Sequence, residues 1–168
     1  MPANRCFIMG HHDCPDHYFN HIMPPLLTMT SFHNVTEFYV GTHGNFDRLA
    51  AEAVQLIKKH NPEIRLIMLE PYPRRRLTLP EGFDGVYSPP DAKSDRYAIV
   101  RMNRHMVDTV EYLLTYADGR GTNSDKILRY AQPRIASGEL RVFNIDRLVQ
   151  RFEHKLTDDP DDGIMDLS

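Results

Sequence analysis

Five short apolar runs along the chain are typical of buried strands, because they show little polar alternation and end at glycines or polar residues. They are Arg5 to Met9, Glu37 to Val40, Ile64 to Leu69, Tyr112 to Tyr116 and Arg141 to Ile145. The segments between them have a different period, with apolar residues every three or four positions.

That second period predicts helices. It is clearest over residues 45–60, where we expect Asn45 to cap the start of the helix and Asn61-Pro62 to end it. Further helices are expected over 16–30, broken at Pro24-Pro25, over 96–109, and over 124–132, where Pro133 ends the helix. Residues 71–95 are rich in proline and glycine and predict a long loop.

Strands that alternate with helices indicate βαβ units. The sequence therefore predicts a Rossmann-like, three-layer α/β/α domain with a mainly parallel five-stranded sheet. We expect this single domain to span residues 1–155, followed by an acidic, disordered tail over 156–168.

Composition narrows the classes of partner. The 168 residues are 41% apolar and 26% charged, and no apolar run is long enough to cross a bilayer. Without its acidic tail the net charge of −3 becomes near neutral, which argues against binding to duplex nucleic acid. Only Cys6 and Cys14 are present, so we expect a reducing, cytoplasmic location. Neither a membrane partner nor a cofactor is expected, and a homodimer is compatible with the sequence.

Three polar loops follow predicted strands and should meet at one edge of a parallel sheet, where such sheets bind ligands. They are Gly10-His11-His12-Asp13, Gly41-Thr42-His43-Gly44-Asn45 and residues 118–123. Glycines and a helix start favour a bound phosphate in the second loop, although a plain strand-to-helix turn has the same pattern. In the third loop, Thr122 and Asp125 have capping-box spacing, so Asp125 is either a cap or a catalytic carboxylate.

Two other groups of residues have competing interpretations. Arg101, Arg104 and Asp108 share one face of a predicted helix. This face is either solvated, or one or both arginines bind a phosphate or carboxylate. One segment is rich in side chains of the kinds that bind zinc: His11, His12, Asp13, Cys14, His17 and His21. Because no Cys-x-x-Cys or His-Glu-x-x-His motif is present, we expect histidines of a pocket or surface and no metal.

In combination, several stretches resemble the SLOG superfamily, which includes the Lonely Guy phosphoribohydrolases and the core of DNA-processing protein A. The matching stretches are Phe7 to His11, Phe38 to Gly41, Asp47 to Ala51, Asn103 to Asp108, Asp118 to Thr122, and Tyr130-Ala131. They occur in the family's order and span residues 5–132. The resemblance implies a nucleotide pocket, with phosphate near Gly41 to Asn45 and Gly121-Thr122.

Three departures from the family pattern bear on catalysis. His12 stands where relatives usually carry arginine, and Met102 occupies the position of the phosphoribohydrolases' catalytic arginine. The glycine-rich loop is reduced to Gly121-Thr122, with Asp125 in the position of the family's glutamate. Arg101 is the nearest substitute for the missing arginine, but it points about 100° away around the helix.

These observations favour binding or sensing of a nucleotide-derived ligand, with weak or no catalysis. The alternatives are hydrolysis of the N-glycosidic bond of a nucleoside monophosphate, by Asp125 with Arg101 or Arg104, and binding of single-stranded DNA. The residues expected to bind the ligand are Gly10, His11, His12, Gly41, Thr42, His43, Gly44, Asn45, Asp47, Asn103, Arg104, Gly121 and Thr122.

Overall fold

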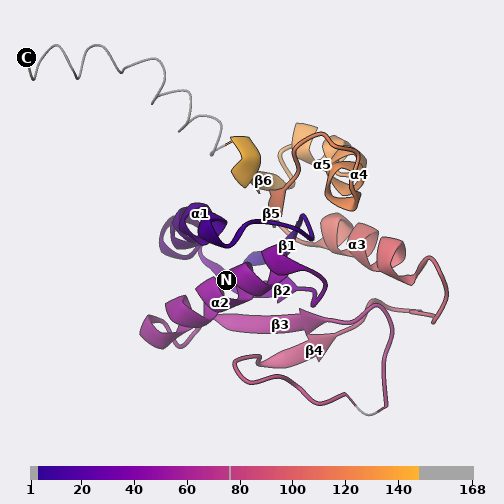
Figure 1. The fold of residues 1–168 in the computed structure, drawn as a ribbon, viewed down its shortest axis with the longest axis horizontal. Coiled ribbons are helices and arrows are strands. Elements are labelled where there is room, and N and C mark those ends of the chain that lie inside the picture. The colour runs from indigo at the N-terminus through magenta and orange to yellow at the C-terminus, as the bar shows by residue number, and fades with distance from the viewer. Residues whose placement is uncertain (1–3, 76, 148–168) are drawn as a thin grey trace, which may run out of the picture.

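The computed structural model describes residues 4–75 and 77–147 and contains one six-stranded, entirely parallel sheet (Figure 1). The strands are β1 (Asn4–Gly10), β2 (Val35–Val40), β3 (Arg65–Leu69), β4 (Gly85–Tyr87), β5 (Tyr112–Tyr116) and β6 (Arg141–Asn144). Their order in the sheet is β4-β3-β2-β1-β5-β6, so the first strand of the chain lies in the interior of the sheet. The predicted α/β class and parallel sheet are confirmed.

Helices pack on both faces of the sheet, and each face has its own apolar core. The helical elements are η1 (Asp16–Tyr18), α1 (Phe19–Phe32), α2 (Asn45–His60), α3 (Ala98–Thr109), α4 (Asn123–Tyr130) and α5 (Gln132–Ala136). Ile8 of β1 faces the core formed with α1 and α2, whereas the neighbouring Phe7 faces the core formed with α3 and α4. This alternation is the three-layer arrangement expected from the sequence.

The predicted strand count of five was too low by one, because β4 lies inside the segment interpreted as a long loop. It has only three residues, pairs with β3 at the edge of the sheet, and exposes Val86. A strand of this length leaves no periodic pattern to recognise, since its pairing depends on backbone hydrogen bonds to β3.

The expected break at Pro24-Pro25 was also wrong, since α1 continues through both prolines. Each proline removes one backbone hydrogen bond, to the carbonyls of Asn20 and His21. Asn20 is exposed to water, which can replace the lost donor, and Ile22 and Leu26 are fully buried against the core. Burial of this apolar face therefore outweighs the local preference for a break.

Other expectations fall partly outside the described residues. The acidic tail over 156–168 and the domain boundary at residue 155 lie there, so both stay predictions. Pro133 lies in the first turn of the new helix α5, a position that tolerates proline, after α4 has ended at Tyr130. Among the described residues, no helix has the length and apolarity needed to cross a membrane.

Candidate functional site

The loops that follow β1 and β2 pack directly against each other, and two glycines permit this contact. A Cβ atom at Gly10 would lie 2.4 Å from the ring of Phe46. Gly44 has a φ of +112°, and a Cβ there would lie 2.7 Å from the Cα of His12. The backbone amide of Asn45 donates a hydrogen bond of 2.9 Å to the His12 carbonyl, and this bond joins the two loops. Residues with side chains would force these loops apart.

Asn45 has a different role from the predicted one. Gly44 precedes the helix as its N-cap, and Asn45 is the first helical residue. Its side-chain amide donates to the Cys14 carbonyl at 2.5 Å and to Asp16 Oδ1 at 2.7 Å. The residue therefore ties the segment after β1 to the start of α2.

The loop that follows β5 is organised by Asp125. Its carboxylate accepts hydrogen bonds from the backbone amides of Gly119, Gly121 and Thr122, at 2.8, 2.8 and 3.0 Å, and forms a capping box with Thr122. Partial burial opposes ionisation, but the amides outweigh it and lower the pKa of Asp125. The capping interpretation of Asp125 thus has direct structural support.

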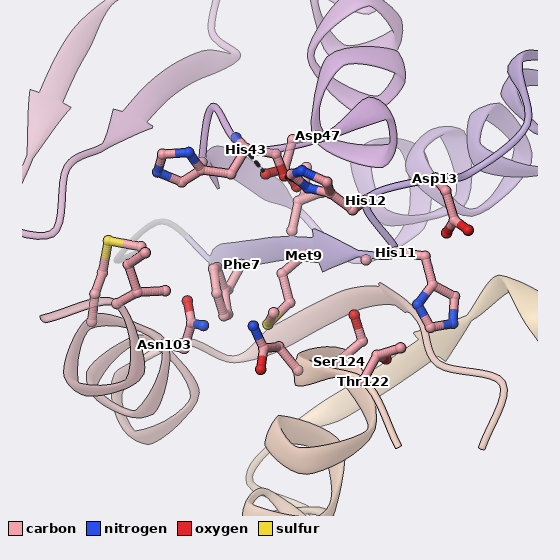
Figure 2. Close-up of a pocket in the computed structure, with 16 residues that line it drawn as sticks. Phe7, Met9, His11, His12, Asp13, His43, Asp47, Asn103, Thr122 and Ser124 are labelled. Carbon is pink, nitrogen blue, oxygen red and sulfur yellow. Dashed lines mark hydrogen bonds between the residues drawn. The ribbon is translucent and has the colours of Figure 1, made fainter. Parts of the chain in front are cut away.

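These loops surround a cavity of about 740 Å³ at the carboxyl edge of the sheet (Figure 2). Its walls come from the end of β1, the loop before α2, the inner face of α3 and the first turn of α4. The lining residues are Phe7, Ile8, Met9, Gly10, His11, His12, Asp13, Gly41, His43, Asp47, Ile99, Met102, Asn103, Thr122, Asn123 and Ser124.

Eight of the residues expected to bind a ligand line this cavity. They are Gly10, His11, His12, Gly41, His43, Asp47, Asn103 and Thr122. Thr42 and Gly44 line a separate hollow of about 360 Å³, which shares Gly41 and Asp47 with the main cavity. Asn45, Arg104 and Gly121 do not line the main cavity. The parallel sheet thus brings the three predicted loops together, as expected.

None of the three residues proposed for catalysis, Asp125, Arg101 and Arg104, lines the cavity. Arg101 donates to Asp95 Oδ2 at 2.9 Å, and the Arg104 guanidinium lies 4.8 Å from the centre of the Tyr130 ring. Met102 does line the cavity and belongs to the apolar core beneath α3, so that core fixes the rotation of the helix. Because Met102 faces inward, Arg101 and Arg104 are turned away.

Asp47 is the most perturbed ionisable group in the cavity. Its side chain is buried, and Oδ2 accepts a hydrogen bond of 3.3 Å from the His43 amide. Oδ1 is also buried and has no hydrogen-bond partner among the described residues. Burial raises the pKa of Asp47 to about 7, and the His43 amide only partly opposes this. The carboxyl group therefore titrates near neutral pH.

Three histidines complete the polar part of the lining. His11 Nε2 lies 2.8 Å from Asp118 Oδ1, in a close contact that lacks the alignment of a regular hydrogen bond. The His11 ring also meets the edge of Tyr116, with ring centres 4.6 Å apart. His12 Nδ1 donates to the His43 carbonyl at 3.2 Å, because a carbonyl can only accept. The histidines thus fix the two loops to each other and to the end of β5.

The alternative metal interpretation gains no geometric support. Within residues 4–75 and 77–147, no three His, Cys, Asp or Glu side chains are grouped as a metal site would require. His17 and His21 both pack edge-on against Tyr18. Burial, with smaller contributions from Asp13 and Asp16, raises the pKa of the Cys14 thiol to about 12.

Sequence reasoning missed the apolar floor of the cavity and part of the α4 wall. Met9 and Ile99 were interpreted only as strand and helix positions, and Ser124 only as a helix start. Ser124 directly follows Thr122-Asn123 at the predicted start of a helix, and this position was the available signal. No pattern marked Ile99, since its exposure to the cavity depends on how α3 is rotated.

Comparison with known proteins adds information at the level of the fold. No protein-family model matches the sequence, and no curated protein matches it significantly. The X-ray structure of DNA processing protein A from Streptococcus pneumoniae matches with a TM-score of 0.61 and 14% identity, over 89% of this chain and 56% of that one. This chain therefore spans little more than half of that protein.

A second match is DNA processing protein A from Helicobacter pylori, whose structure describes a single-stranded DNA binding mode. It has a TM-score of 0.52 and 14% identity, over 90% of this chain and 81% of that one. At such identity the likeness concerns the fold alone. It agrees at the level of the fold with the resemblance found in the sequence: this chain has a Rossmann-like fold similar to that of DNA processing protein A.

Proposed function

We propose that this protein binds a nucleotide or nucleotide-derived ligand in the cavity at the carboxyl edge of its sheet, with weak or no catalysis. The observation that carries the proposal is the cavity itself, which lies between the first turns of α2 and α4. Its volume of about 740 Å³ is in the range typical of small-molecule sites. Open α/β sheets bind their ligands at this edge.

The lining favours binding over hydrolysis. Met102 places a thioether where the phosphoribohydrolases are expected to place a guanidinium, and no Arg or Lys is among the described residues that line the cavity. The Asp125 carboxylate is already engaged by three loop amides. An N-glycosidic bond that breaks here would lack electrostatic stabilisation, a loss that commonly costs about 10²–10³ in rate.

Calorimetric titration tests the proposal. We expect at least one of adenosine or guanosine 5′-monophosphate to bind, with little or no free base detected by chromatography after long incubation. A short oligothymidylate serves as the comparison for single-stranded DNA. Absence of any mononucleotide binding, tighter binding of the oligonucleotide, or rapid release of base would each contradict the proposal.

A further inference from the structure

Two buried polar side chains border the cavity from opposite faces of the sheet. Asp47 lies on α2 and Asn103 on α3, and each is only 7% exposed. Asp47 Oδ1 is buried and has no hydrogen-bond partner among the described residues, and Asn103 lines the same cavity. Because buried polar groups in folded proteins are nearly always hydrogen-bonded, an unpartnered oxygen beside a cavity indicates that a ligand completes it.

The Asp47 carboxyl group is held in one orientation. Oδ2 accepts from the His43 amide, and a Cβ at Gly41 would lie 3.1 Å from the same oxygen, so the backbone passes close to it. Figure 2 shows Asp47 with His43 and His12 at one wall of the cavity, and Asn103 on the other side beside Phe7. Oδ1 is therefore the carboxyl oxygen of this wall that is left without a hydrogen-bond partner among the described residues.

The position of Asp47 also decides where an anion does not belong. Asp47 is in the first turn of α2, and its carboxyl group accepts the amide hydrogen bond that a phosphate would otherwise receive there. A phosphate beside it would meet a like charge. At α4, by contrast, the Asp125 carboxylate is already engaged by three amides of the preceding loop. Asn123 and Ser124 of the first turn line the cavity, and first-turn amides have no acceptor within their helix. The anionic end of a ligand is therefore favoured at α4.

We propose that Asp47 and Asn103 select the neutral end of the ligand. In this arrangement Asp47 Oδ1 accepts a hydrogen bond from a hydroxyl or amino group, Asn103 pairs with the same moiety from the α3 side, and the phosphate lies against α4. The inference rests on the proposed nucleotide site and names what that site recognises. The donor is either a ribose hydroxyl or an amino group of the base.

Calorimetry with three nucleotides and three proteins tests this inference. The ligands are adenosine 5′-monophosphate, its 2′-deoxy analogue and purine riboside 5′-monophosphate, which lacks the amino group. The variants are Asp47→Asn and, as a matched control, Asp108→Asn, an exposed carboxylate on α3 that accepts from Tyr130 outside the cavity. Circular dichroism confirms that both variants fold.

We expect the native protein to bind adenosine 5′-monophosphate at least about tenfold more tightly than one of the analogues, because a hydrogen bond to a charged group is lost. Asp47→Asn should abolish this discrimination and Asp108→Asn should keep it. The analogue that loses affinity identifies the donor as hydroxyl or amino. If Asp47→Asn binds nucleotides with unchanged discrimination, the inference about Asp47 is overturned but the proposed function stands. If the native protein binds no nucleotide, both the inference and the proposed function are overturned.

A second measurement needs only the native protein. The ¹³C shift of the Asp47 carboxyl carbon can be followed against pH with and without adenosine 5′-monophosphate. A ligand that donates to Oδ1 stabilises the carboxylate, so the pKa of Asp47 should fall on binding. An unchanged or raised pKa would overturn the inference. The other titratable or charged groups that line a cavity with Asp47, among the described residues, are His11, His12, Asp13, His43, Arg48 and Glu52, and their resonances are followed in parallel.

Discussion

At the scale of single residues, Asp47 destabilises the free protein at neutral pH. Burial raises its pKa to about 7, whereas the unfolded chain has a pKa near 3.8. Its contribution to stability is therefore fully present below pH 4 and is lost as pH rises through 7. We expect Asp47→Asn to gain stability relative to the native protein over this window, up to a few kcal/mol, since one pKa unit corresponds to about 1.4 kcal/mol.

Urea unfolding of both proteins at pH 4, 5.5 and 8 measures this difference. The expected result is a gap that widens with pH and levels off above neutrality. Parallel pH profiles would show that the Asp47 carboxyl group titrates normally in the folded state.

Gly10 provides a second prediction at the residue scale. A methyl group at this position would overlap the Phe46 ring, so Gly10→Ala should cost about 1–3 kcal/mol through overpacking. Gly85→Ala is the matched control, because the nearest atom to its Cβ is the end of the Arg65 side chain, 3.9 Å away. Thermal unfolding compares the two variants. Equal melting temperatures would contradict the close packing of the loop after β1 against α2.

At the scale of elements, the loop before α4 depends on one carboxylate. Asp125→Ala removes the acceptor of three backbone amides and one partner of the capping box, so it should cost about 1–2 kcal/mol. Hydrogen exchange should accelerate at Gly119, Gly121 and Thr122, while amides of α2 stay unchanged. Unchanged exchange in this loop would mean that other contacts hold it.

Elements also show how far sequence reasoning reached. The bounds of α2 and β5 were predicted to the residue, because an amphipathic helix and a fully buried strand both leave strong periodic signals. The short edge strand β4 was missed because its pairing depends on a neighbour. The meeting of the glycine loops followed from parallel topology. In contrast, the unpartnered oxygen of Asp47 and the outward rotation of Arg104 depend on tertiary packing, which no local pattern encodes.

Arg104 is a residue for which the sequence and the structure predict different effects of substitution. From the sequence, Arg104→Ala was expected to weaken nucleotide binding, but the structure places the guanidinium over Tyr130 and away from the main cavity. We now expect the calorimetric affinity for adenosine 5′-monophosphate to change by less than about twofold, as for surface substitutions in general. A tenfold loss would show that the ligand extends along the groove between α3 and α4.

At the scale of the whole molecule, the cavity joins the two helical layers. Its walls come from α2 on one face of the sheet and from α3 and α4 on the other. A bound nucleotide should therefore protect all three loops together from hydrogen exchange, at residues 10–13, 41–47 and 119–124. It should also stabilise the fold by about 2.7 kcal/mol at a hundredfold excess over Kd. Protection of one loop alone would place the ligand elsewhere.

The interior position of β1 has a consequence for the order of events during synthesis. β1 pairs with β2 about thirty residues later, but its other edge receives β5, which begins at residue 112. As the chain emerges, β1 to β4 have all their mutual partners long before β5 exists, and the far edge of β1 stays unpaired meanwhile. An unpaired strand edge can pair with the wrong strand, and strands that are far apart in the sequence pair slowly. A nascent chain halted before residue 112 would thus expose the unpaired edge of β1 in a sheet of four strands. Chaperone binding should be strongest at that chain length.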